Sequence, residues 1–156
     1  MELVILVGLQ GAGKSTFYRE RFAASHELVS MDLLRNNPRP RRRQEHLIAE
    51  ALAAGRSVVV DNTNPTPADR TPLIALAREY GATVTGYFFD VPRAECLVRN
   101  RQREGRARVP DVAVYTTAKK LVRPTYAEGF DRVYDVRTDG EGGFVVREVA
   151  QGAVSD

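Results

Sequence analysis

The 156-residue chain contains a single cysteine, Cys96, which excludes an internal disulfide bond and suits a reducing compartment. No stretch approaches the roughly 20 consecutive apolar residues of a membrane-spanning helix. Met1 and Glu2 lead directly into an apolar run, so no signal peptide is expected. We therefore expect a cytoplasmic protein without a membrane segment, in which Cys96 is a buried and unreactive thiol.

Lysine is also scarce. Of the 23 basic residues only Lys14, Lys119 and Lys120 are lysine, and the rest are arginine. The arginine excess reflects either a GC-rich genome or recognition of phosphate by guanidinium groups, and composition does not distinguish the two. Position in the chain is more informative, because arginines concentrate at residues 39–43 and again at 99–108.

Length and composition fit one globular domain. The chain is 43% hydrophobic and 28% charged, with a formal net charge of +3, which is ordinary for a soluble protein. We expect a single domain over residues 1–150 and a frayed tail at residues 151–156. The composition does not indicate an oligomeric state.

Apolar runs alternate with segments of helical periodicity. Strands are predicted at residues 2–7, 27–30, 57–60, 83–89, 132–136 and 144–149, the last two joined by a hairpin turn at 139–143. Helices are predicted at residues 14–24, 43–54, 67–80, from about 93 onward, and 111–122, with Pro38 and Pro40 interrupting the chain. The alternation predicts an α/β fold with a mostly parallel central sheet, helices on both faces and ligands at the carboxyl ends of the strands.

The most informative segment is residues 8–15, which read G-L-Q-G-A-G-K-S directly after an apolar run. This is the pattern of a phosphate-binding P-loop in its usual strand–loop–helix context. Its glycines let the backbone approach phosphate oxygens, and its N–H groups form an anion site. Lys14 would reach the β- and γ-phosphates of ATP, and Ser15 would ligate Mg²⁺. The predicted nucleotide contacts in this region are Gly8, Gly11, Ala12, Gly13, Lys14, Ser15 and Thr16.

Polar side chains follow the second and third predicted strands. Asp32 is placed to act as a general base, although aspartate is equally common as a helix N-cap. Arg35, one turn later, would share its face and hold an anionic acceptor. Asp61 resembles the acidic end of a Walker B strand and would hold Mg²⁺ through water. The polar segment 61–65 is also compatible with a turn that precedes a helix cap.

The arginine-rich segment 99–108 lies where P-loop kinases have a lid. Arg99 and Arg103 are four residues apart, so we expect them on one helical face, closing over the β- and γ-phosphates and neutralising charge during transfer. Gly105 offers a flexible point. The arginines at 39–43 are explained equally well by a solvated surface and by contact with a polyanion.

These motifs together resemble the 5′-kinase domain of polynucleotide kinases, end-healing enzymes of nucleic-acid repair. The resemblance covers about residues 2–136, and its most specific elements are D-N-T-N-P at 61–65 and P-T-Y-A-E-G-F at 124–130. Many members have Asn-Arg before the general base, where this chain has Ser30 and Met31. The resemblance implies a P-loop kinase fold with an arginine-rich lid.

The resemblance also implies ATP-dependent phosphorylation of a 5′-hydroxyl end of DNA or RNA. Asp32 matches the general base, Arg35 matches an arginine that contacts the acceptor phosphate, and Lys14 and Ser15 match the donor and metal contacts. Arg99 and Arg103 match the family's lid arginines, which contact the ATP phosphates. The motif near the acceptor matches Asn62, Thr63 and Asn64.

No D-x-D-x-T phosphatase motif follows an apolar strand, and the chain has no ligase module, so these repair activities are expected in separate partner proteins. Two other functions remain open from the residues alone. One is a P-loop kinase of a small-molecule hydroxyl, such as a sugar, a nucleoside or an antibiotic. The other is a nucleotide-binding regulatory ATPase that uses Asp61 to poise a water.

Overall fold

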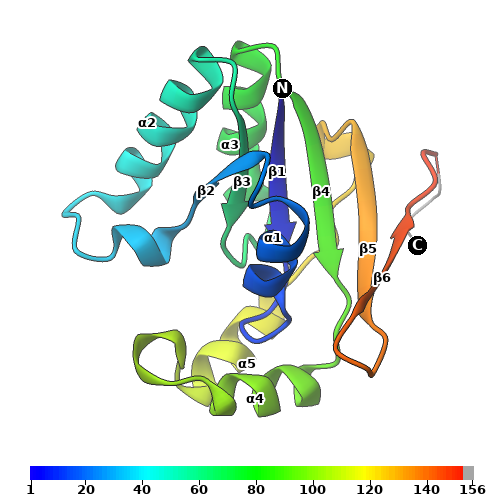
Figure 1. The fold of residues 1–156 in the computed structure, drawn as a ribbon. Helices are drawn as coiled ribbons and strands as arrows, with labels where there is room; N and C mark the ends of the chain where they lie inside the picture. The colour runs from blue at the N-terminus through cyan, green and yellow to red at the C-terminus, as the bar shows by residue number, and fades with distance from the viewer. Residues whose placement is uncertain (153–156) are drawn as a thin grey trace.

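The computed structural model describes residues 1–152, apart from the side chain of Arg106. The predicted frayed tail at 151–156 falls mainly on residues 153–156, which lie outside the described residues. One six-stranded sheet forms the centre of the molecule, in the order β2-β3-β1-β4-β5-β6 (Figure 1). Its strands are β1 (Glu2–Val7), β2 (His26–Val29), β3 (Ser57–Asp61), β4 (Thr83–Phe89), β5 (Arg132–Thr138) and β6 (Phe144–Glu148).

The sheet is mostly parallel. Strands β1 to β5 pair in parallel with their neighbours, whereas β6 runs antiparallel to β5. The glycine-rich segment 139–143 joins β5 to β6, so the predicted hairpin is confirmed. The predicted α/β fold with a mostly parallel central sheet is confirmed as well.

Within residues 1–152 the chain forms five α-helices and three short 3-10 helices, and none of them is both long and apolar enough to cross a membrane. The α-helices are α1 (Lys14–Arg21), α2 (Pro40–Ala53), α3 (Pro67–Glu79), α4 (Arg93–Gln102) and α5 (Asp111–Lys120). The 3-10 helices are η1 (Met31–Leu34), η2 (Gly105–Ala107) and η3 (Tyr126–Glu128).

The start of α2 corrects the sequence-based prediction. Pro40 was expected to interrupt the chain, but it is the first residue of α2. A proline is favourable there because the first turn of a helix does not use its N–H groups internally, and the ring already holds φ near its helical value. Helix α2 therefore begins before residue 43 and includes Arg41, Arg42 and Arg43.

Alternate residues of β1 face two separate hydrophobic layers. Leu3 and Ile5 pack with the layer under α2 and α3, which includes Ile48. Val4 packs on the opposite side with the layer under α1, which includes Phe17. Because both faces are covered, β1 is a continuous apolar run, as is typical of a central parallel strand.

Cys96 lies in the layer under α1, on α4, and its side chain is fully buried. Burial raises the pKa of this thiol to about 11, so it is protonated at neutral pH. The predicted buried thiol is confirmed.

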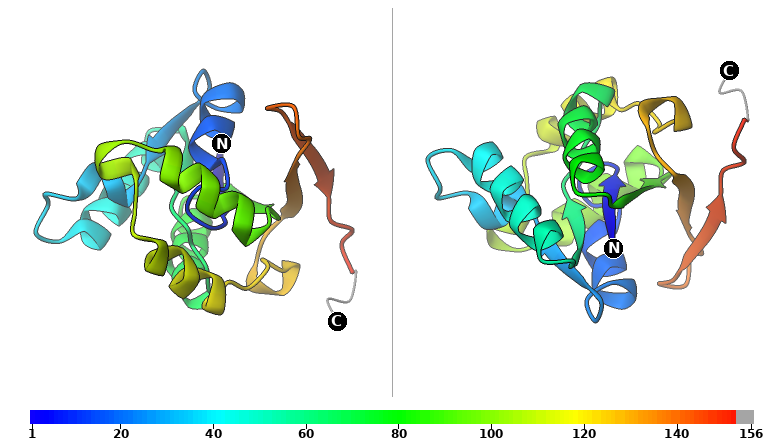
Figure 2. Two further views of the ribbon diagram at one scale, coloured as in Figure 1. Left: turned by 90° about the horizontal axis from the view of Figure 1, so that it is seen from below. Right: turned by 90° about the horizontal axis from the view of Figure 1, so that it is seen from above.

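The carboxyl ends of β1, β2 and β3 meet at one edge of the sheet. The P-loop follows β1, η1 follows β2, and loop 61–65 continues from the last residue of β3. Helices α4 and α5 lie across this edge, as the view from below in Figure 2 shows. The fold thus gathers three chain segments under a helical cover, where a parallel sheet is expected to bind ligands.

Candidate active site

The P-loop is fitted closely against α4. Gly11 and Gly13 have φ values of +84° and +101°, which favour glycine. A Cβ on Gly11 would collide with the main-chain carbonyl of Cys96, and a Cβ on Gly13 would lie 3.0 Å from Nη1 of Arg99. The positive φ of both glycines shapes the loop, and at Gly11 the close approach of the α4 backbone leaves no room for a side chain. A backbone of this shape at the start of α1 is suited to holding phosphate.

Lys14 is buried inside the loop that it ends. Its Nζ donates hydrogen bonds to the carbonyl oxygens of Gly8 and Leu9, at 3.0 and 2.7 Å. Burial lowers the pKa of this ammonium to about 8, and the negative charge of Asp61 partly opposes that shift. Lys14 is thus a charge held mainly by backbone carbonyls, in the loop where phosphate oxygens would bind.

Ser15 and Asp61 face each other across the carboxyl ends of β1 and β3. The Ser15 Oγ donates a hydrogen bond of 2.8 Å to Oδ2 of Asp61. Hydroxyl and carboxylate oxygens are ligands that Mg²⁺ accepts, and Mg²⁺ commonly takes only one or two of them when phosphates supply the rest. Nowhere in residues 1–152 do three or more His, Cys, Asp or Glu side chains gather as a metal cluster. The pair therefore fits a Mg²⁺ that arrives with a nucleotide.

Asp32 projects its carboxylate outward from η1. Ser30 is the N-cap of this short helix, since its Oγ accepts a hydrogen bond of 3.2 Å from the Asp32 N–H. The alternative reading of Asp32 as a helix cap is therefore wrong. Its side chain is 85% exposed, and its ion-pair partner is Arg35, whose Nη2 lies 3.4 Å from Oδ1. The carboxylate is thus accessible to a substrate hydroxyl.

Loop 61–65 binds its neighbours through both backbone and side chains. The Asn62 Oδ1 accepts a hydrogen bond of 2.8 Å from the N–H of Met31, and its Nδ2 donates to Gln44 at 2.8 Å. The Asn64 Nδ2 donates to the carbonyl of Leu6 at 2.8 Å. The two asparagine amides thus bind the segment that carries Asp32 and the end of β1, which is a structural use of this motif.

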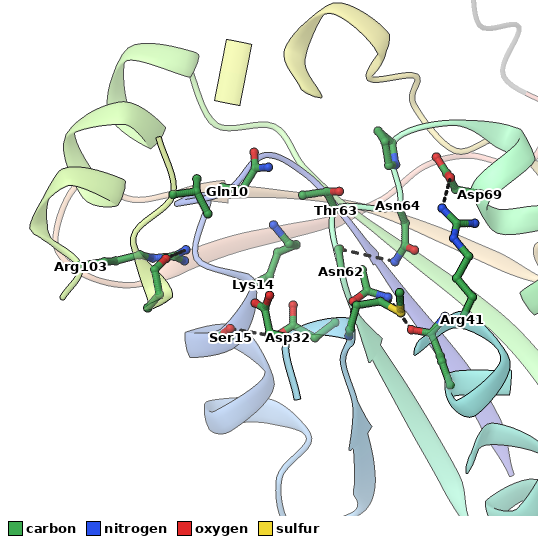
Figure 3. Close-up of a pocket in the computed structure, with 16 residues that line it drawn as sticks. Gln10, Lys14, Ser15, Asp32, Arg41, Asn62, Thr63, Asn64, Asp69 and Arg103 are labelled. Carbon is green, nitrogen blue, oxygen red and sulfur yellow. Dashed lines mark hydrogen bonds and ion pairs between the residues drawn. The ribbon is translucent and has the colours of Figure 1, made fainter. Parts of the chain in front are cut away.

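These segments enclose a cavity of about 320 Å³ (Figure 3). Its walls include eight residues predicted for the site: Lys14, Ser15, Asp32, Asp61, Asn62, Thr63, Asn64 and Arg103. Arg35 contacts Asp32 but is not part of the described wall. The wall also includes the polar side chains of Gln10, Gln44 and Asp69, which sequence reasoning did not single out, and of Arg41, which it considered only as a member of the arginine group at 39–43.

Arg41 and Gln44 were missed because their helical phase was unknown. With α2 starting at Pro40, these two residues lie about one turn apart and face the cavity together. The available signal was the arginine group at 39–43, which did not show which member turns toward the site. Arg41 lies at the far end of the cavity, with its Nη2 3.8 Å from Oδ1 of Asp69 (Figure 3).

The lid arginines differ from the expectation of one shared helical face. Helix α4 ends at Gln102, and Arg103 has extended backbone angles, with φ −73° and ψ 150°. Arg103 consequently leaves the helical face of Arg99, and its Nη1 donates to the Ala107 carbonyl at 3.3 Å. Both arginines still border a second cavity of about 210 Å³ over the P-loop, together with Gly11, Gly13, Thr16, Gly142 and Phe144.

Comparison with known sequences identifies relatives of this arrangement. The family described as AAA domain matches residues 3–125. A protein of Schizosaccharomyces pombe named bifunctional polynucleotide phosphatase/kinase is 29% identical over 141 residues, which is 86% of this chain and 33% of that protein. The chain thus spans about a third of the length of the curated relatives that it matches. The resemblance inferred from the motifs is confirmed in sequence.

Solved structures share the fold. A gluconokinase from Sinorhizobium meliloti 1021 aligns with a TM-score of 0.63 and 20% identity, covering 88% of this chain and 83% of that one. The Mycobacterium tuberculosis APS kinase, in complex with AMPPNP and APS, aligns with a TM-score of 0.57 and 21% identity over 88% of both chains. These similarities establish a P-loop kinase fold.

We expect nucleotide affinity to weaken as the pH rises above about 8, because Lys14 attracts phosphate only while protonated and its pKa is lowered to about 8. At pH 9 only about a tenth of this ammonium remains charged in the free protein, so the Kd for ATP should be about tenfold higher than below pH 7. Titration calorimetry at several pH values measures this change. The Lys14→Ala variant should bind ATP weakly at every pH, without a change in Kd near pH 8. If the affinity of the wild-type protein for ATP does not change up to pH 9.5, Lys14 is not the group that binds phosphate.

Proposed function

We propose that this chain, which belongs to the AAA domain family and has a P-loop kinase fold, transfers the γ-phosphate of ATP to the 5′-hydroxyl end of DNA or RNA. The observation that carries the proposal is the position of Asp32 in one cavity between a pair of cations on one side and a single cation on the other. Lys14 and Arg103 lie on the P-loop side of the carboxylate, and Arg41 lies on the other (Figure 3).

The two cation groups suit two different anions. Lys14 and Arg103 adjoin the P-loop, so they suit the phosphates of the donor. Arg41 stands apart from them; 78% of its side chain is exposed, and its 3.8 Å ion pair with Asp69 would compete with a ligand for the guanidinium. An acceptor that carries its own phosphate groups would use this third cation, whereas an uncharged sugar would not. The name of the Schizosaccharomyces pombe relative supports the same acceptor class.

The proposed chemistry is a single in-line displacement. The Asp32 carboxylate accepts the proton of the 5′-hydroxyl as the hydroxyl oxygen forms a bond to the γ-phosphorus. The bond from that phosphorus to the β–γ bridging oxygen breaks, and ADP leaves. Lys14 and Arg103 offset the negative charge on the transferring group. Mg²⁺, held through Ser15 and Asp61, would supply further charge neutralisation when bound.

The proposal concerns the kinase step alone, since the chain spans a third of its curated relatives. The proposed partner is a nucleic-acid end, and the proposed location is the cytoplasm. Phosphorylation of a small-molecule hydroxyl would use the same donor machinery. The similarity to gluconokinase and APS kinase concerns the fold, because the identities are 20% and 21%. The choice of acceptor therefore depends on experiment.

Incubation with γ-labelled ATP, Mg²⁺ and a short 5′-hydroxyl oligonucleotide should transfer label to the oligonucleotide. A copy that already carries a 5′-phosphate should stay unlabelled, because it lacks the attacking hydroxyl. Gel separation of the labelled strands measures the outcome, and parallel DNA and RNA strands establish the preference. Absence of label on both hydroxyl strands, with ATP still bound, would refute the proposed acceptor and favour a small-molecule kinase.

The Asp32→Ala variant should bind ATP nearly as well as wild type and lose at least about a hundredfold in kcat, because it removes the base but leaves the P-loop intact. Calorimetry for ATP and initial rates for the oligonucleotide measure the two effects separately. Asp32 is exposed and does not cap η1, so the substitution should leave the fold unchanged. A kcat within a few-fold of wild type would remove Asp32 from the mechanism.

The Arg41→Ala variant should raise the KM for a 5′-hydroxyl oligonucleotide about tenfold, with a smaller change in kcat, because a phosphate contact made in the ground state is lost. Arg42→Ala is the matched control, since Arg42 is exposed on the same helix but does not line the cavity. Initial rates at several salt concentrations measure both variants. Equal changes in the two would show that general surface charge, rather than Arg41, binds the acceptor.

A further inference from the structure

Arg70 carries a charge that the proposed transfer does not use. It lies on α3 with 0% of its side chain exposed, and it is the largest fully buried side chain among the described residues. A guanidinium does not lose its charge inside a protein, so it must be satisfied by partners. Those partners come from loop 61–65, which lines the cavity, and from the segment 122–128.

The Arg70 guanidinium connects three parts of the chain. Its Nε and Nη2 donate to the two carboxylate oxygens of Glu128, at 2.8 and 3.1 Å. Its Nη1 donates to the carbonyls of Asn64 and Val122, both at 3.0 Å. The Glu128 carboxylate also accepts the N–H of Thr125 at 2.8 Å. Helix α3, loop 61–65 and the segment 122–128 are thereby held around one planar group.

The bond to Asn64 falls at a sensitive point of the loop. Asn64 has a φ of +43°, a left-handed conformation that its surroundings must maintain. The preceding residue, Thr63, accepts a 3.0 Å hydrogen bond from the N–H of Gly8, the first residue of the P-loop. The following residue, Pro65, accepts one of 2.8 Å from Val122. A displacement of the Asn64 carbonyl would therefore also displace the adjacent Thr63 carbonyl, which bonds to the P-loop at Gly8.

The energetics favour a role in geometry over one in stability. A buried ion pair is often no more stabilising than apolar residues of the same volume, because desolvation offsets the attraction. The fork of an arginine does impose fixed directions on its partners, which a hydrophobic contact would not. We infer that Arg70 and Glu128 are positioning residues, which hold loop 61–65 in the conformation that aligns the P-loop with Asp32. The effect on turnover rests on the proposed function, whereas the effect on the loop does not.

The double variant Arg70→Met/Glu128→Leu tests this inference, because it removes both charges at similar volume and leaves neither unpaired. The variant also removes the partners of the Asn64 and Val122 carbonyls and of the Thr125 N–H, so the melting temperature should fall by several degrees while the protein still folds. Hydrogen exchange should become at least about tenfold faster in peptides that contain Gly8 and residues 61–66. The kcat per nucleotide-binding molecule should fall about tenfold or more, with little change in acceptor KM, since misalignment affects the reacting geometry. Unchanged exchange and unchanged kcat would overturn the inference.

Arg70→Lys provides a second test if the double variant does not fold, because it keeps the buried charge but loses the fork. We expect faster exchange in the same peptides and a lower kcat. Restoration of wild-type values by lysine would show that charge alone suffices and would overturn the positioning role. Arg78→Ala is the control on the same helix. Arg78 pairs with Asp131 at 2.8 Å and donates to the carbonyl of Gly129, which follows Glu128, but it does not bond to loop 61–65. The variant should change neither exchange in the loop nor kcat.

The two arms separate the inference from the proposed function. If the wild-type protein does not phosphorylate an oligonucleotide, the acceptor assignment fails. Exchange at residues 61–66 and at Gly8 still tests the bond from Arg70 to the loop. If phosphorylation is present and the variants leave both exchange and kcat unchanged, the positioning role alone fails.

Discussion

The arrangement of the site depends on loop 61–65, because this segment bonds to the P-loop, to η1 and to α2. Its carbonyl at Thr63 accepts the N–H of Gly8, and its amide at Asn64 donates to the end of β1. The amide of Asn62 reaches both the residue before Asp32 and Gln44 on α2. Loop 61–65 therefore fixes the positions of the P-loop, η1 and α2 relative to one another. A shift of this loop would move the donor side and the acceptor side relative to each other.

The charged side chains around this loop differ in how deeply they are buried. Lys14 is buried among carbonyls, and desolvation lowers the pKa of its ammonium group. Because little water surrounds this charge, a phosphate bound beside it would stabilise the protonated form. Asp32 and Arg41 are exposed, and their ion-pair partners are Arg35 and Asp69, respectively. Arg70 is buried and fully paired, which is the expected state for a charge that holds structure rather than substrate. The three cations thus differ in burial: Lys14 and Arg70 are buried, and Arg41 is exposed.

Local sequence predicted best where one physical signal dominates. The apolar run of β1 followed by G-x4-G-K-S predicted a buried strand and a phosphate-binding loop, and the glycine conformations agree. It predicted less well where two signals compete. Pro40 is typical both of an interruption in the chain and of the first residue of a helix. It begins α2 in the structure, where the apolar face of the helix packs on the sheet. Arg103 was expected on a helical face, yet α4 ends one residue earlier.

The sequence by itself determined the succession of strands and helices along the chain, the P-loop and the candidate residues at the ends of β1, β2 and β3. Periodicity and loop chemistry are local properties, so they can be recognised without the tertiary structure. Tertiary structure alone decided two matters: that Arg41 lines the cavity, and that Arg70 joins loop 61–65 to Glu128. Each depends on side-chain direction or on contact between residues distant in the chain. A single sequence carries no record of such contacts, because they arise only when the sheet and its helices pack together.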